Sequence, residues 1–155
     1  METQKIILVA QAPSKDSRPP EVPFGGRPGR ALAALMGVEP VNLHLYFERL
    51  DLVADGGHVA GSRGDRFDFE GARKMVAERH AVYLKGRLAI FLGSKVATVF
   101  DSSASPALVW YRDVERGFTF AIYPHPSGVD PFWKDAANVA KAKAFFGSIV
   151  QERAA

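Results

Sequence analysis

Five stretches of the chain have the pattern of apolar residues expected for β-strands. Lys5–Ala10 and Arg87–Leu92 are nearly continuous aliphatic runs, which is typical of strands buried on both faces of a parallel sheet. Three further segments have the length and residue types of strands: Val41–Phe47, Leu108–Arg112 and Phe118–Tyr123. The apolar positions therefore predict a sheet of four or five strands.

Apolar residues with helical spacing lie between and after these strands. They predict helices over Pro28–Met36, Asp68–His80, Lys95–Phe100 and Pro131–Gln151. The first of these opens with a proline, which suits the first turn, and Gly37 is a good residue to end it. The second begins with an aspartate, which can cap the amino end of a helix.

The order of these elements predicts the fold class. Strands that alternate with helices favour a three-layer α/β/α sandwich around a central, mostly parallel sheet of four to five strands. The glycine-rich segment Asp51–Asp68 and the proline-rich segment Pro13–Phe24 are expected to be surface loops, and Glu152–Ala155 a frayed tail. With 155 residues, we expect one domain that covers residues 1–155.

Three of the predicted strands end in small or special residues. The first is followed by residues 10–13, A-Q-A-P, another by residues 93–94, G-S, and the last by residues 124–127, P-H-P-S. Neighbouring parallel strands have their carboxyl ends on one rim of the sheet, and open α/β sheets bind ligands there. We therefore expect these three strand ends to converge on a binding site.

The composition is that of a globular protein with a small excess of positive charge. Hydrophobic residues make up 47% of the chain, and the formal net charge is +3. A basic balance suits a polyanionic partner such as nucleic acid. The chain has no cysteine, which excludes disulfides and cysteine-ligated metal centres. We see neither a membrane span nor a secretion signal, so we expect a cytoplasmic protein without membrane association. We also expect the protein to be a monomer.

Four short motifs follow one another along these elements. Residues 10–14 read A-Q-A-P-S, residues 23–32 read P-F-G-G-R-P-G-R-A-L, residues 92–97 read L-G-S-K-V-A, and residues 125–127 read H-P-S. In this order they resemble the uracil-DNA glycosylase superfamily, and most closely its thermostable iron–sulfur branch. That branch has G-E-A-P-G, P-F-V-G-R-A-G-R-L-L and L-G-x-x-A, while H-P-S belongs to the superfamily. The likeness covers nearly the whole chain, although the cysteines that hold the cluster are absent.

The resemblance implies a DNA glycosylase of base-excision repair, which flips a uracil-type base out of DNA and hydrolyses its N-glycosidic bond. It implies no metal and no cofactor. By position in the motifs, Phe24 is the ring that stacks on the base, Gln11 lies beside the sugar and the attacking water, and His125 donates to the base oxygen. The remaining base-binding positions are Ala12, Ser14, Gly93 and Ser94.

Some positions depart from the family pattern or are assigned less directly. Strict uracil enzymes have a bulky tyrosine where Ser14 stands, so we predict that bases with a substituent on carbon 5 also enter. The general uracil enzymes have an aspartate where Ala12 stands, and Asp16 in the following loop is our candidate for the catalytic carboxylate. Contacts to the DNA backbone are expected from Ser127, Arg27 and Lys134.

Two other functions fit the same pocket. Without a working catalytic acid, the protein would bind a nucleobase or modified DNA and leave it uncleaved. A hydrolase of free nucleosides is the third reading, and a preference for free nucleosides over oligonucleotides would favour it. Base release with formation of abasic sites separates the enzyme from the binding module.

Overall fold

The computed structural model describes residues 4–11, 26–53, 67–126 and 130–154. Within these ranges a five-stranded sheet has the strand order β2-β1-β3-β5-β4. The strands are β1 (Ile6–Ala10), β2 (Phe47–Asp51), β3 (Leu88–Leu92), β4 (Tyr111–Asp113) and β5 (Phe118–Tyr123). Strands β2, β1, β3 and β5 run parallel, and β4 pairs antiparallel with β5 at one edge.

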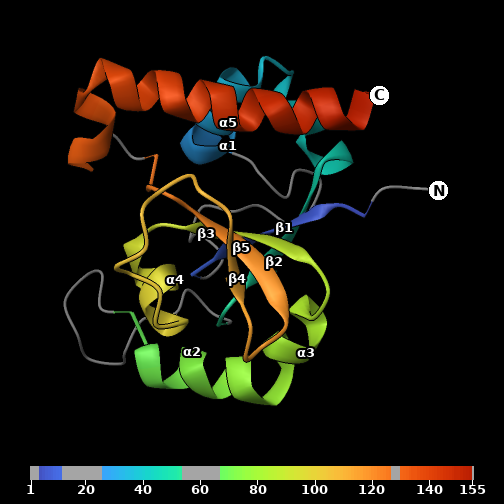
Figure 1. Cartoon of the computed structure of the whole chain (residues 1–155), viewed down its shortest axis with the longest axis vertical. Helices are drawn as coiled ribbons and strands as arrows, with labels where there is room; N and C mark the ends of the chain where they lie inside the picture. The colour runs from blue at the N-terminus through green and yellow to red at the C-terminus, as the bar shows by residue number, and fades with distance from the viewer. Residues whose placement is uncertain (1–3, 12–25, 54–66, 127–129, 155) are drawn as a thin grey trace.

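Helices cover both faces of this sheet. One layer consists of α1 (Gly26–Met36) and α5 (Ala136–Ala154), and the other of α2 (Phe69–Met75), α3 (Ala81–Leu84) and α4 (Ser94–Val99) (Figure 1). The predicted three-layer α/β/α sandwich with a mostly parallel sheet is therefore confirmed.

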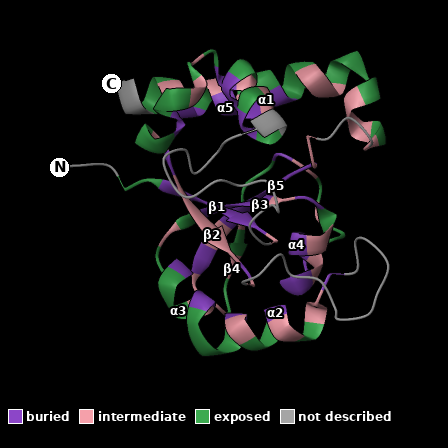
Figure 2. Cartoon of the chain, turned by 180° about the vertical axis from the view of Figure 1, so that it is seen from behind, coloured by how far each residue is buried: buried purple, intermediate pink, exposed green. Residues whose placement is uncertain are grey.

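Two hydrophobic clusters hold the three layers together. In β1, Ile7 and Val9 belong to the cluster under α2 and α4, whereas Ile6 and Leu8 belong to the cluster under α1 and α5. Consecutive side chains of a strand point to opposite faces, so an unbroken apolar run supplies both layers. All five residues of β1 are buried, and Figure 2 shows the buried strands between the two helical layers.

Two residues end or begin helices as the sequence predicts. Gly37, after α1, has a φ of 70°, a left-handed conformation that glycine adopts readily. The side chain of Asp68 caps α2, because its Oδ1 accepts a hydrogen bond of 2.9 Å from the backbone N–H of Gly71.

The predicted strand over Val41–Phe47 is wrong. Residues Pro40–Leu45 form a 3₁₀ helix, η1, and the strand begins only at Phe47. Proline fits the first turn of a helix but cannot donate to a strand ladder, and the local bond from Tyr46 N–H to Leu43 O (3.0 Å) continues the turn. Leu45 is consequently 54% exposed and does not share the buried face of Phe47.

Other predicted boundaries also change. The strand expected over Leu108–Arg112 starts later, at Tyr111, because Leu108 has a left-handed φ of 59° that a strand does not accommodate. The helix that begins after Asp68 does not end near His80, since a π-helical segment, η3 (Val76–His80), carries it on into α3.

The carboxyl-terminal helix is divided and longer than predicted. A 3₁₀ turn, η4 (Pro131–Lys134), precedes α5, and the extended backbone of Asp135 (φ −97°, ψ 120°) separates the two. The expected frayed tail at Glu152–Ala155 is wrong for most of its length, because α5 runs to Ala154.

Candidate functional site at the carboxyl ends of three parallel strands

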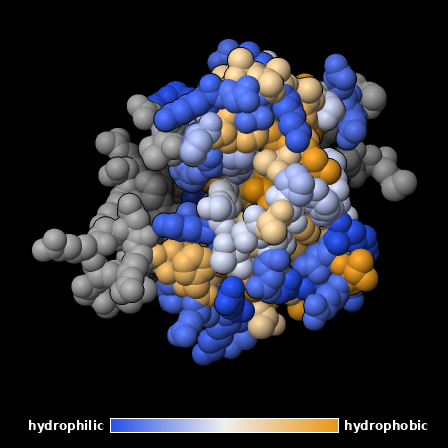
Figure 3. Space-filling model, turned by 60° about the vertical axis from the view of Figure 1, so that its left-hand side comes forward, coloured by the Kyte–Doolittle hydropathy of each residue, from blue (hydrophilic) through white to orange (hydrophobic). Residues whose placement is uncertain are grey.

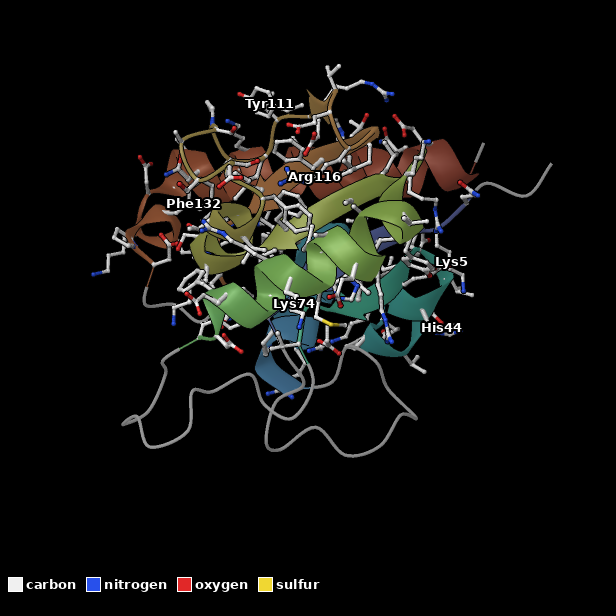
Figure 4. All side chains as sticks on the ribbon, turned by 90° about the horizontal axis from the view of Figure 1, so that it is seen from below. Lys5, His44, Lys74, Tyr111, Arg116 and Phe132 are labelled. Atoms are coloured by element: carbon white, nitrogen blue, oxygen red, sulfur yellow. The ribbon has the colours of Figure 1, made fainter. Side chains whose placement is uncertain are left out.

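The carboxyl ends of β1, β3 and β5 lie next to one another. Strand β3 pairs with β1 through Val9 and Phe91, and with β5 through Leu92 and Tyr123. The three strand ends therefore share one rim, as the order of the elements predicts. Figure 4 labels Phe132, in the turn η4 that follows β5, on the side of the molecule opposite Lys5, which precedes β1. The rim and the amino ends of the strands therefore face in different directions.

Gln11 leaves β1 at this rim. It is half-buried, and its carbonyl oxygen accepts a hydrogen bond of 3.1 Å from the N–H of Val53. A matching bond of 3.0 Å joins the N–H of Leu52 to the carbonyl of Ala10. These bonds continue the parallel ladder past the ends of β1 and β2, so the backbone of Gln11 is held by the sheet itself.

Gly93 and His125 lie close together at this rim. The N–H of Gly93 donates to the carbonyl of Tyr123 over 2.8 Å, which ties the end of β3 to the end of β5. A Cβ atom placed on Gly93 would lie 3.6 Å from Cβ and 3.7 Å from Cδ2 of His125. His125 therefore lies on the side of Gly93 from which a Cβ would project. Ser94 is exposed and begins α4, where its carbonyl oxygen accepts from the Thr98 hydroxyl (2.8 Å).

The surroundings of His125 favour its neutral form. Burial lowers the pKa of His125 and the positive charge of Lys95 lowers it further, while the carboxylate of Asp130 acts in the opposite direction. A neutral imidazole keeps one N–H donor and one acceptor nitrogen. At neutral pH the ring can therefore donate a hydrogen bond without carrying a charge.

This lowered pKa makes folding stability depend on pH. Between the folded-state pKa of His125 and its ordinary value of 6.5, the unfolded chain binds more protons, so stability falls as the pH decreases through that interval. Replacing His125 with Gln removes this titration. We expect the loss of unfolding free energy between about pH 7 and about pH 5, measured by urea denaturation, to be smaller in His125→Gln than in the parent. Equal losses in both proteins would contradict the assignment.

A tryptophan fixes the backbone that carries His125. The indole Nε1–H of Trp133 donates to the carbonyl of His125 over 2.9 Å, and its ring packs edge-on against Tyr123 at 5.8 Å. Asp130 caps η4 through a bond of 3.0 Å from the N–H of Phe132. Trp133 is thus a structural partner of the His125 segment. The sequence contains no spacing rule that would reveal this contact.

The other candidate residues fall into three groups. Lys134 is exposed at the end of η4, close along the chain to the Trp133 contact. Arg27 lies in the first turn of α1, and its side chain is outside the described residues. The remaining assignments also lie outside the described residues: Ala12, Ser14, Asp16, Phe24 and Ser127. The structure accordingly juxtaposes Gly93 and His125, with Gln11 at the same rim.

No group of three or more His, Cys, Asp or Glu side chains among residues 4–11, 26–53, 67–126 and 130–154 is placed to hold a metal ion. Within the described part of the chain, no helix combines the length and apolar character needed to cross a membrane. Comparison of the sequence with protein-family models and with curated proteins finds no match.

Proposed function

We propose that this chain is a DNA glycosylase-like enzyme that flips a uracil-type or 5-substituted pyrimidine into a pocket and hydrolyses its N-glycosidic bond. The observation that carries the proposal is the proximity of His125 to Gly93 at the shared rim of β3 and β5. Glycine lets a planar base approach the backbone closely, and a neutral imidazole beside it supplies a directed donor.

The reaction separates charge between base and sugar. The bond from C1′ to the base nitrogen breaks with its electron pair on the base, and a water oxygen forms the new bond to C1′. One proton of that water ends on the base or in solvent, so atoms and charge balance. The N–H of His125 would stabilise the negative charge that develops on the base oxygen. Gln11 would position the water, and Asp16 would serve as the carboxylate on the sugar side.

Positive charges on the same side of the molecule suit a DNA backbone. Lys95 lies near enough to His125 to affect its pKa, and Lys134 is exposed on η4. Together with Arg27 and Ser127, they would contact phosphates flanking the flipped nucleotide. Lysines contribute to affinity but not to the choice of base, so base selection is left to the pocket.

A second candidate is a binding module that holds the base without cleaving it. An amide, Gln11, stands at the end of β1, and an amide cannot take a proton from water. Among the described residues, Asp130 is the carboxylate that influences His125, and its side chain already caps η4. These two facts favour binding without hydrolysis.

A base-release assay separates the two candidates. Oligonucleotides with uracil, 5-hydroxymethyluracil or thymine are offered as single strands and as mismatched duplexes, and abasic sites are counted. We expect release of uracil and of at least one 5-substituted base, because the side chain of a serine at position 14 is much smaller than the tyrosine of strict uracil enzymes. Release of uracil alone would contradict the prediction, made from Ser14, that bases with a substituent on carbon 5 enter the pocket. Tight binding with no release from any substrate would establish the binding module instead.

A further inference from the structure

The helix that follows Asp68 carries a histidine at a position that faces the core. Buried residues recur along it at every fourth position: Ala72, Val76, His80 and Leu84. An α-helix has 3.6 residues per turn, so each step of four residues drifts by about 40° around the helix axis. The π-helical segment η3 has a longer hydrogen-bond spacing, which offsets this drift between Val76 and His80. The π segment thus keeps His80 on the side of the helix that faces the sheet.

A buried histidine is unusual in this interior. Hydrophilic side chains cover much of the face drawn in Figure 3, and among the described residues the buried polar or charged ones are His80 and Ser102, 8% and 9% exposed. Ser102 bonds locally to the carbonyl of Phe100, whereas Nε2 of His80 lies 3.0 Å from the carbonyl oxygen of Leu52, 28 residues away along the chain. Since a carbonyl oxygen only accepts, Nε2 of His80 carries the proton and donates.

The peptide group that accepts this bond also reaches the candidate site. The carbonyl of Leu52 and the N–H of Val53 belong to one planar peptide group, and that N–H donates to the carbonyl of Gln11 over 3.1 Å. The peptide group therefore links His80 on one side to Gln11 on the other. Because it is planar and rigid, it cannot turn without breaking both bonds. Hydrogen bonds in such a chain also polarise and strengthen one another.

His80 acts where the sheet gives its own backbone the least support. Strands β1 and β2 end at Ala10 and Asp51, and the bond from Val53 to Gln11 is the final one of their ladder among the described residues. The end of a ladder opens more easily than its middle. A donor from the helical layer at this point therefore holds the last peptide group of β2 in place.

We propose that His80 is a positioning residue of the candidate site. By holding the peptide group between Leu52 and Val53, it fixes the backbone of Gln11 and hence the side chain that orients the attacking water. This inference rests on the proposed glycosylase function, in which Gln11 has that role. The effect of His80 reaches the chemistry only through Gln11, so the two residues should act as a unit when both are changed.

The first measurement is amide hydrogen exchange in the full chain, followed by NMR, which requires no activity. In the parent, the N–H of Val53 should exchange slowly although it lies at the end of the ladder. His80→Leu removes the donor, and exchange at Val53 should become about 10-fold faster. His80→Gln keeps a side-chain N–H and should restore slow exchange. The matched control is Tyr83→Phe, which removes the 2.6 Å bond from α3 to Glu48 near the amino end of β2 and should leave Val53 unchanged.

Base release supplies the second measurement. His80→Leu should lower kcat about 10-fold with little change in KM, and His80→Gln should restore it. In a Gln11→Ala background the same substitution of His80 should lower kcat at most about 2-fold, because the side chain that it positions is gone. Tyr83→Phe should release base at the parent rate.

If His80→Leu does not fold, His80→Met takes its place, because the methionine side chain fills irregular space and offers no donor. Fast exchange at Val53 in the parent would overturn the inference without any variant. Equal exchange in the parent and a folded apolar variant, a parent-like kcat, or an equal fractional loss in the Gln11→Ala background would also overturn it. A parent that releases no base would instead contradict the glycosylase proposal, and exchange at Val53 would still decide whether His80 holds the peptide group.

Discussion

Replacing His125 with Ala is expected to slow base release about 100- to 1,000-fold, the usual effect of removing one donor from a developing oxyanion. The donor acts mainly on the transition state, where the base oxygen becomes negative. The loss should therefore appear in kcat, with a much smaller change in KM. Single-turnover release of the preferred base, followed by alkaline cleavage at the abasic site, measures the effect.

His44→Ala is the matched control for this experiment. His44 is exposed, its Nδ1 lies 2.7 Å from the carbonyl of Val41, and Figure 4 places it far from Phe132 and the η4 side of the molecule. It should release base at the parent rate. Thermal unfolding of His125→Ala establishes that the variant is folded when assayed. Parent-like kcat in a folded His125→Ala would exclude this histidine from the chemistry.

The second large effect is expected on stability, from Gly93→Ala. Gly93 has φ 89° and ψ 168°, a backbone conformation that only glycine adopts without strain. An added Cβ would meet His125 at 3.6 Å, an ordinary contact, so the cost comes from the backbone and not from a clash. We expect a loss of about 1–3 kcal/mol in the free energy of unfolding, measured by urea denaturation.

Gly147→Ala provides a control with the opposite sign. Gly147 lies inside α5, and a Cβ added there meets nothing within 4 Å. Alanine stabilises a helix interior relative to glycine by about 0.5–1 kcal/mol, so this variant should be more stable than the parent. If Gly93→Ala proves as stable as the parent, the end of β3 does not need glycine for its backbone geometry.

The features that could be predicted from sequence are those with strong local signals. The buried strand expected over Lys5–Ala10 is found at Ile6–Ala10, and the cap at Asp68 is found as expected. Because parallel strands share one carboxyl rim, the strand ends also predict that Gly93 and His125 lie on the same side, as they do. Local chemistry and one topological rule were enough for these features.

The features that could not be predicted depend on contacts distant in sequence or on competing local signals. At Val41–Phe47 alternation favoured a strand, but Pro40 and a turn of local hydrogen bonds produced η1 instead. The bond from Trp133 to the carbonyl of His125 and the unpartnered hydroxyl of Tyr123 arise only when α5 packs on the sheet. No periodicity or motif encodes such tertiary contacts.

We propose that a flipped base enters the rim where β1, β3 and β5 end. The direct test is a crystal structure with a single-stranded oligonucleotide that carries one 2′-fluoro-2′-deoxyuridine, a nucleotide whose glycosidic bond resists cleavage. We predict that the uracil lies against Gly93, with an imidazole nitrogen of His125 within hydrogen-bonding distance of a base oxygen and Gln11 beside the sugar. An oligonucleotide bound elsewhere, or bound with its uracil outside this rim, would contradict the account.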